Sequence, residues 1–574
     1  MTDEYNFPGY KLPVNPYFEQ GTIACGFVTP KQDRIPQVQS IPPRRVLPII
    51  FIPGIMGSNL RMSAARQAQL EKDNNISWRP EHTLETLASA NDTAEERQLR
   101  LDPDETEVDT YDPVRNPTGD PDETSDERNE EVEVDFSYKV EPAINPPLLR
   151  SDPRGTSGRR TSEQKARARG WGEVYFDSYR ELLEMCEERL NTAFYGGKMD
   201  SWWKKIIDVA PAKWGAHAQP VLAPLDEATL RAAVKGCWFP VHAMGYNWLK
   251  GNEESGTVIA NRIRALMKNY EAQGFQCEKV ILITHSMGGL VARAAIHPAM
   301  GGLNDKVLGI VHGVMPAIGA GAAYKRMRCG FEGSGITTDV LGSTGAHVTP
   351  VLGNAQGGLE LLPSQAYGND WLRVQHTGKI IKSLPEKGDP YEEIYKVKGK
   401  WFNLLQEGWI NPARQRNSSF ENTCHLLDLA KKFHSNINET YHDQSYAHYG
   451  AGAAHPAWRR VVWAVDDRAR VVDVNLLNLV ADDRKGVLTL VDPRFPSPVG
   501  QPGPRFTATM SVAADPGDQT VPLHSAEHQL RSGKFKGIFR QHGYEHQASY
   551  SDESALFSTL FSVVRIAYTM GWSK

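Results

Sequence analysis

The sequence predicts an α/β fold, with a mostly parallel sheet, helices on both of its faces and a large inserted cap. Short apolar runs end in turns that contain glycine or proline, at 45–60, 237–249, 279–284 and 306–316. Helical patterns of apolar residues lie between several of these runs. Strands that alternate with helices in this way form parallel sheets covered on both faces.

The first expected strand is "RVLPIIFIPGIMGSNL" (45–60), an apolar run that ends in Pro-Gly and a second glycine. The run "CWFPVHAMGYNWL" (237–249) predicts another strand. Ser255 then suits the N-cap of a helix. The apolar face expected for this helix consists of Val258, Ile259, Ile263, Leu266, Met267 and Tyr270.

The stretch "KVILITHSMGGLVARAA" (279–295) leads from a strand into a helix through Ser286. A strand that turns at once into a helix strains the turn residue and exposes its hydroxyl above the sheet. Gly288 and Gly289 keep the strand and the helix from clashing, whereas Thr284 stands where the G-x-S-x-G motif has its first glycine. The strand context still predicts that Ser286 is a nucleophile.

A serine nucleophile needs a general base and an acid that orients the base. In this type of core they follow the serine in the order Asp or Glu, then His, each near the end of a later strand. The last strands are expected within 504–522 and 535–547, before a closing helix at 555–572.

Asp518 follows the first of these strands in "GDQTVP", and His542 and His546 follow the second in "QHGYEHQ". The order and the position at strand ends predict Asp518 as the acid and His546 as the base. Asp515 and His542 remain the alternatives.

Four regions are expected along the 574 residues. They are an N-terminal extension (1–44), a first core part (45–325) with a polar charged insertion at about 61–169, a cap (326–500) and a C-terminal core part (501–574). Within the cap, five tryptophans (371, 401, 409, 458 and 463) could pack as core or form a lipid-binding surface, and we expect at least half of them to be core.

The insertion carries most of the charge asymmetry. Residues 101–135 contain 15 acidic and 2 basic residues, although the whole chain has a net charge of only −5. We expect a solvated, partly disordered segment there and in the basic stretch 150–169. "DPDETEVD" lacks the glycine and the spacing of a calcium loop, so it indicates a structural calcium ion only weakly. The composition gives no indication of a nucleic-acid partner.

No stretch of the sequence predicts a signal peptide or a membrane span. We therefore expect a protein made in the cytoplasm. The six cysteines have no metal-ligand spacing. His312 is expected to be a structural histidine bonded to the backbone. The group His442, Asp443 and His448 could hold a metal but is better explained as an aromatic polar loop of the cap. The chemistry predicted for Ser286 requires no cofactor.

Five motifs together resemble the α/β-hydrolase lipases of the lecithin–cholesterol acyltransferase and GPI-inositol-deacylase type. They are "FIPGIMGSNL", "GYNW", "THSMGGLVAR", "GDQTVP" and "HGYEHQ". Four further stretches resemble bacterial type VI secretion phospholipase effectors more closely. They are "GWGEVYFDSY", "PVHAMGYNWL", "VHGVMPAIGAGAAYKRM" and "LELLPSQAYGNDWL".

The resemblance implies an oxyanion hole formed by the backbone N–H groups of Met56 and Met287, and its "HG-x-x-H" pattern favours His546 over His542. It also implies a secreted antibacterial effector that degrades phospholipids of a target cell, in the periplasm or at its membranes. A cognate immunity protein and a component of the secretion machinery would be its partners.

Two other function classes stay open. One is a non-lipid serine esterase or an acyltransferase on the same core. The other is a non-enzymatic toxin or binding module, which a complete set of triad and oxyanion residues disfavours. The large cap favours a lipase over a small-ester esterase, because a long acyl chain needs a covered apolar channel.

Overall fold

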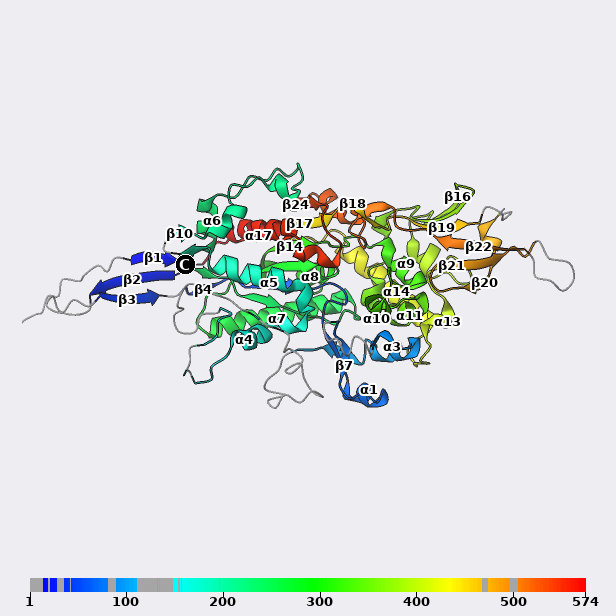
Figure 1. Cartoon of the computed structure of the whole chain (residues 1–574), viewed down its shortest axis with the longest axis horizontal. Coiled ribbons are helices and arrows are strands. Elements are labelled where there is room, and N and C mark those ends of the chain that lie inside the picture. Colours follow the sequence, from blue (N-terminus) through cyan, green and yellow to red (C-terminus); the bar gives the residue numbers. More distant parts are fainter. Residues whose placement is uncertain are drawn as a thin grey trace, which may run out of the picture.

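The structure is a computed structural model of the whole chain. It describes residues 43–80, 89–110, 132, 134, 148–152, 155, 157–195, 197–466, 473–494 and 504–573, and the backbone of the three strands before residue 42. Those strands, β1 (Val14–Phe18), β2 (Gly21–Phe27) and β3 (Pro36–Ile41), form an antiparallel sheet at one end of the molecule (Figure 1).

The core is a six-stranded sheet in which every neighbouring pair is parallel. Its order is β12 (Val241–Ala243), β5 (Ile49–Ile52), β13 (Val280–His285), β14 (Val307–Gly313), β17 (Ser445–Gly450) and β24 (Phe535–Gln541). The α/β fold predicted from the alternating pattern is confirmed, and the expected strands at 45–60, 237–249, 279–284 and 306–316 all contribute to it.

Alternate residues of the core strands enter two hydrophobic clusters on opposite faces of the sheet. Ile50 and Leu282 belong to one cluster, while Phe51 and Ile283 belong to the other. The first face is covered by α7 (Asn252–Ala272) and α8 (Gly288–Ile296). The second is covered by α5 (Phe176–Asn191), α6 (Glu227–Val234) and α17 (Glu553–Tyr568). Burial on both faces explains why the strands are almost wholly apolar.

Helix α7 differs from the prediction at its start. It begins at Asn252 with Gly251 as its N-cap, so Ser255 lies within the first turn and is buried. Val258 is 46% exposed and does not belong to the core face, whereas Ile259 and Ile263 are fully buried. The buried face includes the small residue Gly256, where a Cβ would lie 2.6 Å from the Ala294 Cβ of α8. The close approach of the two helices thus decides which face is buried.

Strand β17 corrects the expected boundary of the cap. Residues 445–450 pair with β14 and β24 in the middle of the core sheet, although they lie inside the segment 326–500 assigned to the cap. The sequence "SYAHYG" contains one histidine and two tyrosines, so it lacks the apolar run by which a buried strand is predicted. His448, for example, is buried and meets the Tyr544 hydroxyl at 3.2 Å.

A second, mixed six-stranded sheet forms the body of the cap (Figure 1). Its order is β16 (Lys379–Leu384), β15 (Leu372–His376), β19 (Val461–Val465), β22 (Arg505–Met510), β21 (Val487–Val491) and β20 (Asn478–Asp482). Strand β22 was expected in the core, so that prediction is wrong. It pairs with β19 and β21 because its alternating residues bury only one face, as in an antiparallel pair rather than a core strand.

The cap contains the helices α9 (Gly321–Cys329), α10 (Ile336–Leu341), α11 (Gly345–Leu352), α12 (Gln356–Leu359), α13 (Glu407–Ile410) and α14 (Phe420–Ile437). Of these, α9, α10, α11 and α14 lie between the two sheets in Figure 1. Four of the five cap tryptophans (Trp371, Trp401, Trp458 and Trp463) are buried, which supports their expected role as core.

The remaining described elements are short. They are β4 (Arg45–Val46) with β11 (Cys237–Trp238), β9 (Phe194–Tyr195) with β10 (Lys198–Met199), β18 (Gly452–Ala457) with β23 (Asp515–Gly517), α4 (Ser162–Ala168), α15 (Leu523–Ala526) and α16 (His528–Arg531). In the described part of the chain no helix is long and apolar enough to cross a bilayer.

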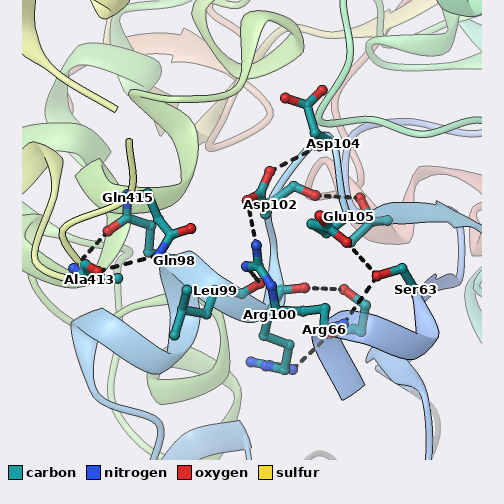
Figure 2. A network of polar contacts seen from close by, with 12 residues as sticks. Ser63, Arg66, Gln98, Leu99, Arg100, Asp102, Asp104, Glu105, Ala413 and Gln415 are labelled. Atoms are coloured by element: carbon teal, nitrogen blue, oxygen red, sulfur yellow. Dashed lines mark hydrogen bonds and ion pairs between the residues drawn. The ribbon is translucent and has the colours of Figure 1, made fainter. Parts of the chain in front are cut away.

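Part of the polar insertion at about 61–169 is built into the fold. It forms a sheet of β6 (Leu60–Met62), β7 (Ile76–Trp78) and β8 (Thr106–Val108) with the helices α1 (Ala64–Gln69) and α3 (Ala94–Arg100). The Gln98 side chain of α3 contacts Ala413 of the cap, as Figure 2 shows. The acidic stretch 101–135, for which we expected a solvated and partly disordered segment, is described only at 101–110, 132 and 134.

The acids of "DPDETEVD" that Figure 2 shows are held by groups of the protein itself. The Arg66 guanidinium pairs with the Asp102 carboxylate at 2.9 Å, and the Ser63 hydroxyl donates to Glu105. Asp102 also accepts the Asp104 backbone N–H at 2.9 Å. An internal arginine, a serine hydroxyl and a backbone N–H thus contact two of these acids, Asp102 and Glu105.

Candidate active site

Ser286 occupies the turn between β13 and α8. Its φ of 52° is rare for a residue with a side chain, so the turn is strained as predicted for this serine. Two glycines make the turn sterically feasible. A Cβ at Gly288 would lie 2.4 Å from the carbonyl oxygens of Ile52 and Pro53, and one at Gly54 would lie 2.9 Å from the Ser286 Cβ.

Thr284 fills the position of the missing first glycine without disturbing this turn. The residue is buried, its hydroxyl lies 3.2 Å from His312 Nδ1, and its carbonyl oxygen accepts a hydrogen bond from the Tyr550 hydroxyl at 3.0 Å. His312 is therefore a buried partner of the strand, in agreement with its expected structural role. The expected bond to the backbone is wrong, since the contact of His312 is with the side-chain hydroxyl of Thr284.

The three residues predicted from strand ends meet in one chain of hydrogen bonds. Ser286 Oγ lies 2.8 Å from His546 Nε2, and His546 Nδ1 lies 2.9 Å from Asp518 Oδ2. Asp518 is 1% exposed and Ser286 4%, so both ends of the chain are nearly removed from water. When the imidazole donates its Nδ1 hydrogen to Asp518, the unprotonated Nε2 faces the serine hydroxyl.

Asp518 reaches this position by a route that differs from the prediction. It follows β23, which pairs with β18 just beyond the end of β17. A Cβ on Gly450, the last residue of β17, would lie only 2.6 Å from the Asp518 Cβ. Asp518 Oδ1 accepts the backbone N–H groups of Thr520 at 3.1 Å and Val521 at 2.7 Å. Asp518 thus lies at the end of β17, a core strand that precedes it in the sequence by more than 60 residues.

The two alternative residues lie outside this chain of contacts. Asp515 forms an ion pair with Arg460 at 3.0 Å. His542 is exposed, at the start of the loop that carries His546. Of the five candidate residues, the tertiary structure therefore brings together Ser286, Asp518 and His546.

Met56 and Met287 lie on the two backbone segments that border Ser286. Met287 follows the serine at the start of α8, and Met56, with φ of 60°, lies in the loop that follows β5. Neither backbone N–H donates to another group among the described residues, while the Met56 carbonyl is held by Trp78 Nε1 at 2.7 Å. Two free N–H groups beside a nucleophile suit the stabilisation of an oxyanion.

His285 is a residue of the site whose role sequence reasoning missed. Its Nε2 donates to the His546 carbonyl oxygen at 3.0 Å, so its Nδ1 accepts a hydrogen bond from the Tyr179 hydroxyl at 3.1 Å. Burial, together with the neighbouring His546, lowers the pKa of His285 to about 3 and keeps the ring neutral. Its place directly before the serine was the one available signal.

Comparison with known proteins agrees with this geometry. Residues 253–319, which contain α7 except for its first residue, β13, the serine turn, α8 and β14, match the family described as a PGAP1-like alpha/beta domain. A chain in the crystal structure of the Tle4–Tli4 complex matches with 30% sequence identity and a TM-score of 0.70, over 92% of this chain and 99% of that one. The chain belongs to the Tle4 family. No match was found among curated proteins.

Membership of the Tle4 family confirms the predicted resemblance to α/β-hydrolase lipases of the type VI effector kind. It also confirms the α/β-hydrolase fold class. Family membership therefore indicates a lipase-type hydrolase, and we interpret the contacts of Ser286 as those of such an enzyme.

A cavity of about 1080 Å³ opens at Ser286 and His546 of this Tle4-family chain and extends between core and cap. Most of its lining is apolar and comes from the loop after β5, from α9 to α12 and from the loop after β22. Among the apolar lining residues are Ile55, Met56, Trp78, Met327, Phe331, Val340, Leu341, Leu352, Leu361, Trp458 and Met510. A lining of this kind suits an acyl chain.

The metal site considered for His442, Asp443 and His448 is not formed. His442 Nε2 lies 3.1 Å from the Val307 carbonyl oxygen and His448 contacts Tyr544, so the two rings serve different parts of the core. Within the described ranges, no group of three or more His, Cys, Asp or Glu side chains could hold a metal ion.

Proposed function

We propose that this protein is a serine-dependent lipid ester hydrolase that cleaves acyl esters of membrane phospholipids. The observation that carries the proposal is the chain of hydrogen bonds from Asp518 through His546 to Ser286, at the wall of a large apolar cavity. This arrangement provides a nucleophile, a base and a binding site for a long acyl chain in one place.

In the proposed reaction, His546 Nε2 takes the proton of Ser286 as Oγ attacks the ester carbonyl carbon. The backbone N–H groups of Met56 and Met287 donate to the oxyanion, and Asp518 stabilises the imidazolium. His546 then gives the proton to the departing alcohol, which leaves an acyl ester on Ser286. A water molecule, activated by the same imidazole, releases the fatty acid.

The size of the cavity supports a lipid over a small ester. About 1080 Å³ is at the upper end of the volumes of ligand sites, and the aliphatic and aromatic part of the lining offers a long apolar surface that a small ester would leave unfilled. A non-lipid esterase or an acyltransferase would use the same three residues, so the substrate and the acceptor have to be distinguished by experiment.

The effector role is part of the same proposal. The related chain was solved as a Tle4–Tli4 complex, which supports a cognate protein partner for this chain as well. We propose that the partner is an immunity protein that covers the mouth of the cavity. Export through a secretion machine, followed by attack on the membranes of a target bacterium, would keep the active enzyme away from the producing cell.

Mass spectrometry of products from defined phospholipid and triglyceride vesicles tests the enzymatic part. The wild-type protein should release fatty acids and lysophospholipid, and Ser286→Ala should release neither. A fluorophosphonate probe should label Ser286 in the wild type. Release of fatty acid by Ser286→Ala at the wild-type rate would refute the proposal.

Expression in a bacterial host with and without a periplasmic targeting signal tests the effector role. Toxicity should appear mainly with the signal and should disappear with Ser286→Ala. Equal toxicity of the serine variant, or harm from the untargeted form alone, would refute delivery to the periplasm.

A further inference from the structure

Two cations of α9 converge on one carboxylate at the wall of the cavity. Lys325 Nζ lies 2.9 Å from Glu332 Oε1, and Arg326 Nη2 lies 3.0 Å from Glu332 Oε2. Arg326 Nε also donates to this second oxygen, at 3.1 Å. All three residues line the same cavity as Ser286.

The protein holds the two cations in place independently of Glu332. Arg326 Nη2 also donates to the Thr520 hydroxyl at 2.9 Å, and Lys325 donates to the Gly330 carbonyl oxygen at 2.8 Å. Lys325 also lies over the Trp458 ring, 5.3 Å from its centroid. The side chains of Lys325 and Arg326 are only 13% and 18% exposed. The cationic pair is therefore largely preorganised.

Glu332 is more exposed than the two cations and lies in the glycine-containing segment between α9 and α10. Its side chain can therefore leave the cations by rotation about its own bonds while its carbonyl oxygen stays bound to the Thr338 hydroxyl at 3.0 Å. The segment between α9 and α10 contains Gly330, Gly333 and Gly335, with φ of 80°, 88° and 98°, and no Cβ contact closer than 4 Å would arise at Gly335. The Glu332 side chain is 34% exposed. Burial raises its pKa, but the charges of Arg326 and Lys325 outweigh this and lower the pKa, so Glu332 is an anion.

The cationic pair is connected to the reactive residues. The Thr520 hydroxyl that binds Arg326 is two residues from Asp518, and the Thr520 N–H donates to the Asp518 carboxylate. Lys485, on the turn between β20 and β21, adds a third cation to the cavity wall and has no ion-pair partner among the described residues. A substrate that reacts at Ser286 thus has positive charge at another part of the same cavity.

We propose that Lys325 and Arg326 form the subsite for the phosphodiester group of a glycerophospholipid, and that Glu332 fills this subsite when no lipid is bound. The inference rests on the proposed function and names the substrate class of the same site. A phosphodiester carries a single negative charge and two non-bridging oxygens, as the Glu332 carboxylate does with its two oxygens. Arginine binds such pairs of oxygens through its planar fork. Neutral glycerides have no group that could replace Glu332.

Steady-state kinetics with two soluble esters of equal acyl length test the subsite. Dihexanoyl phosphatidylcholine carries the phosphodiester, and p-nitrophenyl hexanoate does not. For Lys325→Met and for Arg326→Gln, we expect the ratio of kcat/KM for the phospholipid to that for the nitrophenyl ester to fall tenfold or more, mostly through KM. Glu332→Gln should lower KM for the phospholipid several-fold, because the competing charge is removed.

Lys382→Met is the matched control. Lys382 also pairs with a glutamate, Glu386, and lies over an aromatic ring, but it does not line the cavity. Its substitution should leave the ratio of the two esters as in the wild type. An unchanged ratio in Lys325→Met and Arg326→Gln, or an equal loss on both esters, would overturn the inference.

Calorimetry with the Ser286→Ala protein separates binding from hydrolysis. Dihexanoyl phosphatidylcholine should bind about tenfold more weakly when Lys325→Met is added, and inorganic phosphate should bind far more weakly than the lipid. Phosphate that binds as tightly as the lipid would indicate a free-anion site and overturn the inference. If the wild type hydrolyses neither ester although Ser286→Ala binds the lipid, the proposed function fails and the subsite stands.

Discussion

The ring of His285 lies against the ring of His546, with centroids 5.1 Å apart, and its Nε2 donates to the His546 carbonyl oxygen. The residue before Ser286 thus holds the backbone of His546, the proposed base. The Tyr179 hydroxyl fixes the other ring nitrogen, so His285 has a single neutral tautomer that suits both contacts. This contact joins the serine turn to the loop that carries His546.

Replacing His285 should therefore displace the base while leaving the cavity in place. For His285→Ala we expect kcat on a soluble ester to fall about 10- to 100-fold with little change in KM, since small misplacements of a reacting group cost about this much. His285→Gln, which can still donate to the carbonyl oxygen, should recover part of the loss. A fall in kcat/KM that comes from KM alone would contradict this role.

Substitutions of Asp518 and His546 should each lower kcat by about 10³-fold or more, because triad members act as a unit. Asp515→Asn and His542→Ala are the controls, and both should stay within a few-fold of the wild type, since neither residue contacts Ser286 or His546. If His542→Ala lost activity and His546→Ala kept it, the assignment of the base would be wrong although the enzyme class would survive.

Gly288→Ala should destabilise the serine turn. The added methyl would lie 2.4 Å from two backbone carbonyl oxygens, which side-chain adjustment cannot relieve. We expect a loss of about 1–3 kcal/mol or more, as for other overpacked sites, seen as a lower melting temperature and weaker labelling by a fluorophosphonate. Gly408→Ala is the control, because a Cβ there meets nothing within 4 Å. Equal melting temperatures for both variants would contradict the prediction.

Acid should destabilise the fold through its buried histidines. Burial lowers the pKa of His448 to about 3, from an ordinary value of 6.5. Above pH 6.5 the ring is neutral in both states and stability is complete. As the pH falls from 6.5 towards 3, the unfolded chain binds a proton that the folded chain does not, so stability decreases.

His448→Gln cannot take up this proton. The melting temperature of the wild type should therefore fall relative to that of His448→Gln between pH 7 and pH 5, whatever their difference at pH 7. Scanning calorimetry of both proteins over this range measures the effect. A difference that stays constant with pH would show that His448 titrates normally in the folded protein.

Calcium is not expected to take part in the chemistry, because His546 can activate Ser286 as a general base. Hydrolysis of a soluble ester in excess chelator should keep at least half of its rate. Circular dichroism in the same buffer monitors the fold. Activity that vanishes in chelator while the fold persists, and that returns with calcium, would contradict this expectation.

Much of the core could be predicted because its signals are local. The strand β13, the helix α8 and the serine between them follow from a short apolar run and two glycines, and the structure places α8 at the predicted "GGLVARAAI". His546 could be predicted in the same way, because β24 and the loop after it are continuous in sequence. A parallel strand that is buried on both faces consists of a continuous apolar run, and such a run is visible in the sequence.

The sequence by itself determined the strand–serine–helix turn at Ser286, the chain order of Ser286, Asp518 and His546, and the α/β class, since each depends on the residues next to it. Only the tertiary structure decided which strand stands beside the acid. Asp518 packs against Gly450, which precedes it by 68 positions, and β22 joins the sheet of the cap instead of the core. The convergence of Lys325 and Arg326 on Glu332 could not be predicted from the sequence either, and nor could the contact of Arg326 with Thr520, nearly 200 positions away. Contacts between distant segments depend on the packing of whole elements, and no local pattern of residues encodes them.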